Sequence, residues 1–380
     1  MKTLYKFYLV IITFALSLCV TSCDITSEEE ERNPRTILVY MVANNSLGSA
    51  NFDDSDIEEM KLAATTDGFN EGRLLIYHAS RSGDAPQLKE ITSNGEIIVH
   101  KEYGTSVSSV ESSRMCQVFD DVMEIAPAND YGLILWSHAN GWLQTGIEER
   151  STTPHTAAFG EDAGKQMNVT TLANVLNDYN FSFIYFDCCY MASVEVAYEL
   201  RNATPYIIAS ATEIPADGMP YDINLKYLFA TTPDLQQACA NTFDYYNSRN
   251  DETRSCTISL ISTEPLDELA QCSKAIYADG VTLPTDYTPQ KFMLESRCYL
   301  FDFQHYIRAI TPNGTLLDNY NEALAKAVLY KANTPYMWNS LRLNAHCGLS
   351  TFIVNTESDA DTKGYKQLKW WHDVVSYKFK

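Results

Sequence analysis

The sequence contains 380 residues, of which 45% are apolar and 20% charged, and its formal net charge is −21. This length is enough to bury a large core in one big domain or two smaller ones. So acidic a chain argues against nucleic acid and anionic membrane surfaces as partners, and it would attract cationic substrates.

Residues 1–22 have the pattern of a signal peptide. Lys2 and Lys6 precede an apolar run, residues 7–20, that is too short to span a bilayer as a helix. The leader ends in Val20-Thr-Ser-Cys23, which resembles a bacterial lipobox, so cleavage before Cys23 would leave that thiol to be acylated. The alternative is ordinary secretion with an incidental cysteine.

Residues 23–34 form an acidic tether, in which four glutamates follow Ser27. Such a charge run is typical of a solvated linker. Acidic runs just after the lipid-bearing cysteine also resemble the surface-export signal of Bacteroidetes lipoproteins. We therefore expect a cell-envelope protein with a lipid anchor in the outer membrane, and outer-surface display is open.

From residue 35 the chain alternates two patterns. Short apolar runs predict strands at Thr36–Ala43, Arg73–Ala79, Glu96–His100, Tyr131–Ser137, Phe181–Asp187 and Pro205–Ser210. Apolar residues at helical spacing lie between them, around Ile57, Met60 and Leu62, and in Met115–Val122, Leu172–Leu176 and Met191–Leu200. This alternation predicts a mostly parallel sheet with helices on both faces.

After residue 231 the pattern becomes more helical. Thr232-Pro233-Asp234 and Thr288-Pro289 predict helix starts, and Thr257–Ser262 and Leu349–Val354 predict further strands. We therefore expect a core at residues 35–231 and a C-terminal α+β subdomain at residues 232–380 that packs on it.

A carboxylate and two thiols end one predicted strand. Because side chains alternate along a strand, Asp187 and Cys189 share one side while Cys188 lies on the other. Cys188 is then expected to be a small buried hydrophobe. Cys189 is expected to open the following helix, where the dipole favours a reactive thiolate. A disulfide framework is not expected, since the cysteines show no Cys-x-x-Cys pair.

His138 ends another predicted strand, before the turn signal Asn140-Gly141. It precedes Cys189 by 51 residues, which is room for one crossover helix, so neighbouring parallel strands would present both side chains on one rim. The alternatives are a satisfied core histidine, a second buried cysteine, or a vicinal Cys188–Cys189 disulfide. No metal is expected here, because Cys188, Cys189, His138 and Asp187 lack tight ligand-pair spacing.

Three motifs resemble the clostripain-like cysteine peptidases (family C11, clan CD), which are relatives of caspases, legumains and gingipains. They are Trp136–Trp142, Phe186–Leu200 and Ala209–Tyr221, with weaker matches at Thr36–Ala43 and Cys347–Ser350. Together they cover most of residues 35–380 in family order. The resemblance implies a caspase-like three-layer α/β/α sandwich, and the spacing of His138 and Cys189 is that of caspases.

The resemblance implies that Cys189 attacks the peptide carbonyl to give a thioester, and that His138 acts as base and then as acid. The backbone N–H groups of Cys189 and Ala139 would form the oxyanion hole. Two departures bear on activity, because the family has glycine at position 139 and a small residue at position 188.

Asp187 and Asp217 align with the acidic residues thought to line the family's specificity pocket. Carboxylates there would select Arg or Lys before the scissile bond. The structural alternative is loop capping by Asp217 and a buried hydrogen bond for Asp187. The resemblance also allows calcium, since clostripain is regarded as calcium-dependent, but the scattered acidic residues name no site.

Residues 143–168 form a long polar loop. Relatives cut themselves in the matching loop, so the resemblance predicts autocleavage after Arg150 or Lys165.

Our leading interpretation is a monomeric, lipid-anchored cysteine endopeptidase that cleaves peptides and proteins after Arg or Lys. The alternative is a catalytically silent surface lipoprotein that binds peptides or glycans, as the departures at positions 139 and 188 and the 24 tyrosines would allow. A third interpretation, a flavodoxin-like domain with a chance Cys and His, leaves the three ordered motifs unexplained.

Overall fold

The structure, a computed structural model, describes residues 32–81, 83–143, 159–280, 282–294, 299–362 and 364–380. The predicted signal peptide, the lipidation site Cys23, the acidic run and Arg150 lie outside these residues. The chain divides after Arg32, and the description below concerns Asn33–Lys380. Within the part that the structure describes, no helix is long and apolar enough to cross a membrane.

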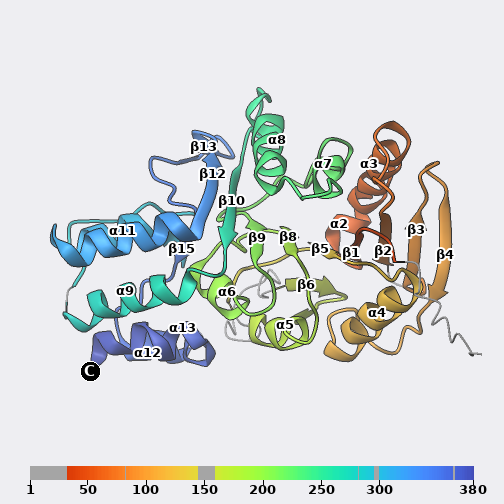
Figure 1. Cartoon of the computed structure of the whole chain (residues 1–380). Helices are drawn as coiled ribbons and strands as arrows, with labels where there is room; N and C mark the ends of the chain where they lie inside the picture. The colour runs from red at the N-terminus through yellow and green to blue at the C-terminus, as the bar shows by residue number, and fades with distance from the viewer. Residues whose placement is uncertain (1–31, 82, 144–158, 281, 295–298, 363) are drawn as a thin grey trace, which may run out of the picture. The chain divides into compact units, whose positions relative to one another are not determined.

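A nine-stranded sheet runs through this unit (Figure 1). From one edge to the other its strands are β12 (Val328–Asn333), β10 (Thr257–Ser262), β9 (Tyr206–Ala209), β8 (Phe183–Asp187), β5 (Tyr131–Trp136), β1 (Thr36–Val42), β2 (Arg73–Ala79), β3 (Gln87–Ile91) and β4 (Ile97–Glu102). The central strands from β9 to β2 are parallel, and the two outer strands on each side pair antiparallel. The parallel strands are almost wholly buried, as strands covered on both faces must be.

Helices cover both faces of the sheet (Figure 1). One face carries α3 (Phe52–Thr66), α7 (Tyr221–Leu228) and α8 (Leu235–Asn247). The other carries α4 (Ser112–Ile125), α5 (Val169–Leu176), α6 (Val194–Glu199), α9 (Leu266–Ala278), α10 (Phe303–Ile310), α11 (Thr315–Ala327) and α13 (Lys369–Asp373). Each set packs into its own apolar core. The predicted α/β fold, with a mostly parallel sheet between two helical layers, is confirmed.

Shorter elements complete the described chain. They are α2 (Ser46–Ser49), β6 (Phe159–Asp162), β7 (Lys165–Met167), β11 (Phe301–Asp302), β13 (Tyr336–Met337), β14 (Leu341–Arg342), β15 (Ser350–Thr351), α12 (Glu357–Thr362), and the 3₁₀ helices η1 (Tyr365–Gln367) and η2 (Val375–Phe379). The sheet continues across residue 232, because β10 and β12 extend the strands that precede this position.

Several local predictions were wrong. The strand predicted at Glu96–His100 is present as β4, but its expected burial was wrong. The side chains of Ile97, Ile98 and Val99 are 42–48% exposed, because β4 is the outermost strand of the sheet. Leu62 is 54% exposed and lies off the buried face of α3. No helix begins at Thr288-Pro289, and only Ser350–Thr351 of the predicted strand at 349–354 is extended into a ladder.

Candidate active site

His138 and Cys189 follow two neighbouring strands of the sheet. Strands β5 and β8 pair in parallel, with Trp136 opposite Asp187 at their carboxyl ends. His138 and Cys189 each lie two residues further along, so the same register brings both to one edge of the sheet. This is the edge at which open α/β sheets hold their ligands.

Cys188 is a buried structural residue. It continues the side of β8 that carries Ile184 and Phe186, and it packs in the same apolar core. Its thiol donates to the carbonyl oxygen of Leu135 at 2.8 Å. Burial raises the pKa of this thiol well above its usual range. Every cysteine among the described residues is a free thiol, so no Cys188–Cys189 disulfide forms.

Cys189 is partly buried beneath the loop that follows β9. The backbone N–H of Ile214 donates to its Sγ at 3.4 Å. Burial raises the pKa of the Cys189 thiol to about 12; the Ile214 hydrogen bond opposes this shift, and the charges of Glu213 and Asp187 add to it. The thiol is therefore protonated at neutral pH in this state.

The prediction that Cys189 opens a helix was wrong. Tyr190 has a φ of 63°, a left-handed conformation that no helix continues. Helix α6 begins at Val194, where the Ser193 hydroxyl caps it by accepting from the Val196 N–H at 3.2 Å. Because a helix dipole acts only within its first turn, it gives the Cys189 thiol no assistance.

The imidazole of His138 is held by a residue that sequence analysis did not identify. Its Nε2 lies 2.8 Å from the Ser46 hydroxyl, which comes from α2 after the end of β1. Asn45 caps α2 by accepting from the Leu47 N–H at 2.9 Å. The available signal was the turn sequence Asn44-Asn45-Ser46, which places a hydroxyl directly after a strand of the same sheet.

The loops that carry His138 and Cys189 are in close contact. Gly141 has a φ of 67°, and a Cβ added there would lie 2.9 Å from the Tyr190 carbonyl oxygen. Ala139 bridges to Phe159 of β6, and the Gly160 N–H donates to the His138 carbonyl at 2.9 Å. The predicted turn at Asn140-Gly141 therefore fixes one catalytic candidate against the other.

Asp187 lies inside the fold below the thiol. The residue is 6% exposed, and its carboxylate accepts from the Met219 N–H at 3.1 Å and from the Tyr221 hydroxyl at 3.0 Å. Burial raises its pKa to about 6, while these hydrogen bonds act in the opposite direction. Its oxygens are thus occupied by donors of the same chain.

Asp217 and Glu213 lie on the loop over Cys189. Asp217 forms an ion pair of 2.6 Å with Arg249. Glu213 accepts from the Tyr190 hydroxyl at 3.0 Å and from the indole N–H of Trp338 at 2.5 Å. Behind the loop, Asp187 and Glu213 line a cavity of about 10 Å³, which is room for a single water.

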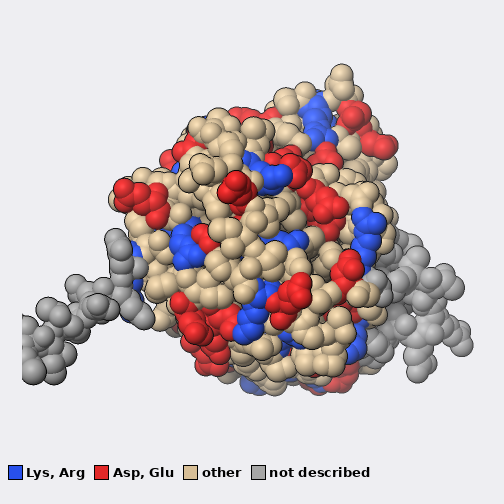
Figure 2. Space-filling view, turned by 90° about the vertical axis from the view of Figure 1, so that its right-hand side faces the viewer, with Lys and Arg blue, Asp and Glu red and all other residues tan. Residues whose placement is uncertain are grey.

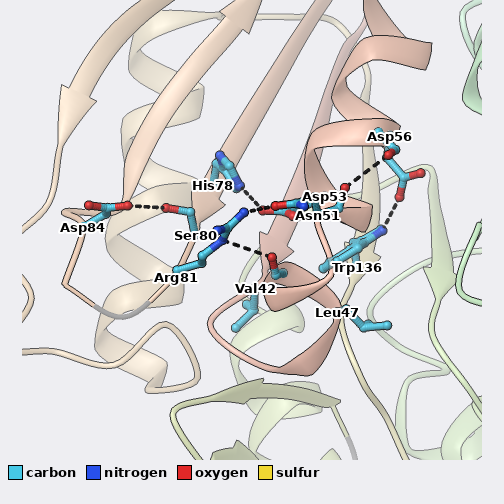
Figure 3. Close-up of polar contacts among 12 residues, drawn as sticks. Val42, Leu47, Asn51, Asp53, Asp56, His78, Ser80, Arg81, Asp84 and Trp136 are labelled. Carbon is cyan, nitrogen blue, oxygen red and sulfur yellow. Dashed lines mark hydrogen bonds and ion pairs between the residues drawn. The ribbon is translucent and has the colours of Figure 1, made fainter.

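One group of side chains in the described part of the chain has metal-ligand spacing. The ligand atoms of Asp53, Asp54 and His78 lie within 4.8 Å of one another. Figure 3 shows the imidazole of His78 directed at Asp53, 2.8 Å from its carboxylate. Lys89 Nζ lies 2.9 Å from the other ring nitrogen.

These contacts do not fit a metal. An ammonium that donates to Nδ1 leaves the proton of neutral His78 on Nε2, the nitrogen that would have to bind the ion. Calcium also prefers oxygen ligands to imidazole. The group is better explained as a hydrogen-bonded Lys89–His78–Asp53 chain, in which His78 and Asp53 are buried and Lys89 is partly buried, although Oδ1 of Asp53 has no hydrogen-bond partner.

The charges on one visible face are mixed. Figure 2 shows Lys and Arg interspersed with Asp and Glu on the side where β3 and β4 lie. The net charge of the chain is therefore not gathered into a single acidic surface on that face.

Comparison with known proteins gives a consistent result. Residues 39–363 match the model of the clostripain family, peptidase C11. An inactive zymogen of a C11 protease from Parabacteroides distasonis is 30% identical, with a TM-score of 0.78, covering 90% of this chain and 99% of that one. No curated protein matches the chain.

Two structures from Bacteroides thetaiotaomicron are also similar. A secreted C11 cysteine protease in complex with an irreversible peptide inhibitor is 28% identical, with a TM-score of 0.75, covering 92% of this chain and 100% of that one. The secreted C11 cysteine protease called iotapain is 24% identical, with a TM-score of 0.79 and coverage of 90% and 100%. With the family match over most of the length, these findings show that the chain is a cysteine protease of the clostripain family, C11.

Proposed function

We propose that this protease is an endopeptidase that cleaves after Arg or Lys, with Cys189 as nucleophile and His138 as general base. The observation that carries the proposal is the β5–β8 register, which brings both side chains to one edge of the sheet. His138 takes the thiol proton, the sulfur bonds to the peptide carbonyl carbon, and the C–N bond breaks as His138 returns the proton to the amine. Water then hydrolyses the thioester.

The backbone N–H groups of Cys189 and Ala139 are the proposed oxyanion donors. The left-handed Tyr190 and Gly141 fix the loops that carry these two groups. Ala139 supplies the same N–H as the glycine that is usual in the family, so this departure keeps the chemistry available.

Asp187 and Asp217 are the proposed selectors of Arg or Lys. Both lie beside the loop that contacts the thiol, and a guanidinium pairs well with carboxylates. In the described state their oxygens are occupied, and the cavity has room for one water. Cleavage therefore requires the 213–218 loop to move.

We further propose that this closed arrangement is a precursor and that cutting in the 143–168 loop activates it. The high pKa of the Cys189 thiol and the small cavity support a resting state. A relative of 30% identity is described as an inactive zymogen. Lys165 lies in β7, paired with β6, and forms an ion pair of 3.3 Å with Glu111. A cut after Lys165 would have to open this pairing, so Arg150 is the preferred site.

The remaining predictions stay part of the proposal. We expect Cys23 to anchor the protein in the cell envelope, at the outer membrane, and we expect a monomer that acts on peptides and proteins. Two relatives are described as secreted, which agrees with export. Calcium dependence also remains a prediction, to be tested by activity with and without a chelator.

The test compares fluorogenic peptides that carry Arg, Lys, Asp or Ala before the reporter group, using the wild type, Cys189→Ala and Cys188→Ala. Arg and Lys cleavage that is lost in Cys189→Ala and kept in Cys188→Ala would establish the nucleophile and the pocket together. Cleavage after Asp would contradict the proposal that Asp187 and Asp217 select Arg or Lys.

The wild-type protein also allows a test of the proposed activation by autocleavage. Incubation of the wild type should split one band into two on a denaturing gel as activity rises, and Arg150→Ala should block both changes while Lys165→Ala does not. A single band at full activity would rule out autocleavage. A protein that stays inactive with calcium and after light trypsin treatment would favour the alternative function, a silent lipoprotein that binds peptides or glycans.

A further inference from the structure

The carboxylate of Asp217 is already paired with an arginine of its own chain. Arg249 Nη1 lies 2.6 Å from Asp217 Oδ2. Arg249 follows Ser248, the C-cap of α8, so the pair joins the end of this helix to the 213–218 loop. The side chain of Asp217 is 40% exposed and that of Arg249 is 24% exposed.

Other contacts hold the guanidinium at this position. Arg249 Nη2 donates to the Tyr245 hydroxyl at 2.6 Å, and Nη1 donates to the Thr253 hydroxyl at 3.0 Å. The guanidinium carbon lies 4.6 Å from the centre of the Tyr245 ring. An arginine fork stacked on an aromatic face and bonded to a carboxylate is the arrangement by which proteins bind an arginine ligand.

Asp217 differs from the two neighbouring acids. Asp187 is buried and accepts from Met219 and Tyr221, and Glu213 accepts from Tyr190 and Trp338. Only Asp217 among these three has a basic side chain as its partner. A charge that enters from solvent can reach this carboxylate, because the side chain of Asp217 is 40% exposed.

We propose that Arg249 is an internal competitor for Asp217, occupying the position that the basic side chain of a substrate takes before cleavage. This inference rests on the proposed role of Asp217 in the specificity pocket. A partly exposed ion pair is worth little free energy, so an incoming Arg or Lys can displace Arg249. Displacing Arg249 lowers the affinity for the substrate. It also limits productive binding to substrate side chains that can replace a cation on Asp217.

The proposal predicts that removing Arg249 changes KM and leaves kcat unchanged. Arg249 contacts none of the reacting atoms, so its loss should leave the chemical step alone. Peptides with Arg or Lys before the scissile bond should bind the variant more tightly. Peptides with a neutral residue there should bind it as they bind the wild type.

The experiment uses Arg249→Gln, with Arg254→Gln as the matched control. Arg254 lies in the same turn and donates to Asn247 at 2.7 Å, away from Asp217. We expect KM for an Arg peptide to fall about fivefold in Arg249→Gln, with kcat unchanged and no shift in the control. An unchanged or higher KM in Arg249→Gln would overturn the proposal and make Arg249 a positioning residue for the loop.

A binding measurement separates this inference from the proposed function. Agmatine, a small guanidinium compound, is titrated calorimetrically into Cys189→Ala with and without Arg249→Gln, after light trypsin treatment has cut both proteins, because neither can cut itself. Tighter binding in the double variant supports internal competition even if no peptide is cleaved, and equal binding overturns it. Arg249→Lys keeps the charge but not the fork, so it should lie between the two, and it replaces Arg249→Gln if the latter unfolds.

Discussion

His138 and Cys189 occupy matching positions on adjacent parallel strands, each two residues beyond the register pair Trp136 and Asp187. Neighbouring strands lie about 5 Å apart, so the sheet itself sets the spacing of the two catalytic candidates. What the sheet does not set is the orientation of the imidazole, to which the contact of Nε2 with Ser46 contributes.

Removing the Ser46 hydroxyl should therefore slow the reaction without weakening substrate binding. We expect Ser46→Ala to lower kcat about fivefold, the effect of losing one exposed hydrogen bond of about 1 kcal/mol, with KM unchanged. Steady-state kinetics would measure both parameters.

Ser49→Ala is the control for this change, since the Ser49 hydroxyl donates to the Asn45 carbonyl within the same short helix. Ser46→Thr should restore most of the rate. Equal losses in Ser46→Ala and Ser49→Ala would show that α2 matters only as a structural element.

Gly141 should tolerate a side chain poorly. Its φ of 67° disfavours alanine, and the added Cβ would approach the Tyr190 carbonyl oxygen at 2.9 Å. We expect Gly141→Ala to lower the free energy of unfolding by roughly 2–3 kcal/mol and to reduce kcat, because the loops of His138 and Cys189 are pushed apart. Urea unfolding and peptide turnover would measure the two effects.

Gly164→Ala isolates the cost of the backbone angle alone. Gly164 has a φ of 80°, but nothing lies within 4 Å of an added Cβ. Gly164→Ala should lower the free energy of unfolding by only about 1 kcal/mol and leave the activity unchanged. If Gly141→Ala lowered stability and activity no more than Gly164→Ala does, the contact between the two loops would not be required for either.

The sequence predicted those parts of the fold that are buried on both faces. The runs at β1, β2, β5, β8 and β9 are mostly apolar, and a strand between two helical layers requires this pattern. The outer strand β4 carries the same residue types on an exposed edge, and the pattern alone cannot distinguish the two settings. Thr288-Pro289 has the composition of a helix start, but tertiary packing continues it as an irregular segment.

In the candidate site, too, some residues could be predicted from the sequence and others could not. His138 and Cys189 were predictable because each directly follows a strand whose neighbour could be inferred. Ser46, Ile214 and Arg249 were not, because each meets its partner only after three-dimensional folding brings distant segments together. The pKa of Cys189 was misjudged for the same reason, since it depends on the loop that covers the thiol.

Asp56 should lower the stability of the protein at neutral pH. Its carboxyl is 2% exposed and accepts from the Trp136 indole N–H at 2.6 Å (Figure 3). Burial, with the charge of Asp187 next, raises its pKa to about 10, so the folded protein holds this acid neutral at pH 7 while the unfolded chain ionises it. We expect Asp56→Asn, which keeps an acceptor for Trp136, to raise the free energy of unfolding at pH 7 by about 1–3 kcal/mol.

The gain should shrink as the pH falls toward the ordinary aspartate pKa and vanish below it, where the wild-type acid is protonated in both states. Asp56→Ala is the contrasting variant, because it leaves the Trp136 N–H without an acceptor and should cost roughly 2 kcal/mol at every pH. A loss of stability in Asp56→Asn at pH 7 would mean that the folded protein uses the ionised form.

Asp187 should make stability fall as the pH rises from about 4 to about 6. Its pKa is raised to about 6 by burial, so the folded state binds a proton more tightly than the unfolded state. Stability is then greatest below the ordinary aspartate pKa and decreases through the folded value, by roughly 2–3 kcal/mol in total. Urea titrations at closely spaced pH values, in the Asp56→Asn background that removes the coupled acid, would measure the slope.

Tyr221→Phe removes a donor to the Asp187 carboxylate, so it should move the pH window upward. A stability curve that is flat from pH 4 to 6 in that background would show that Asp187 is ionised throughout, with its two internal donors outweighing its burial.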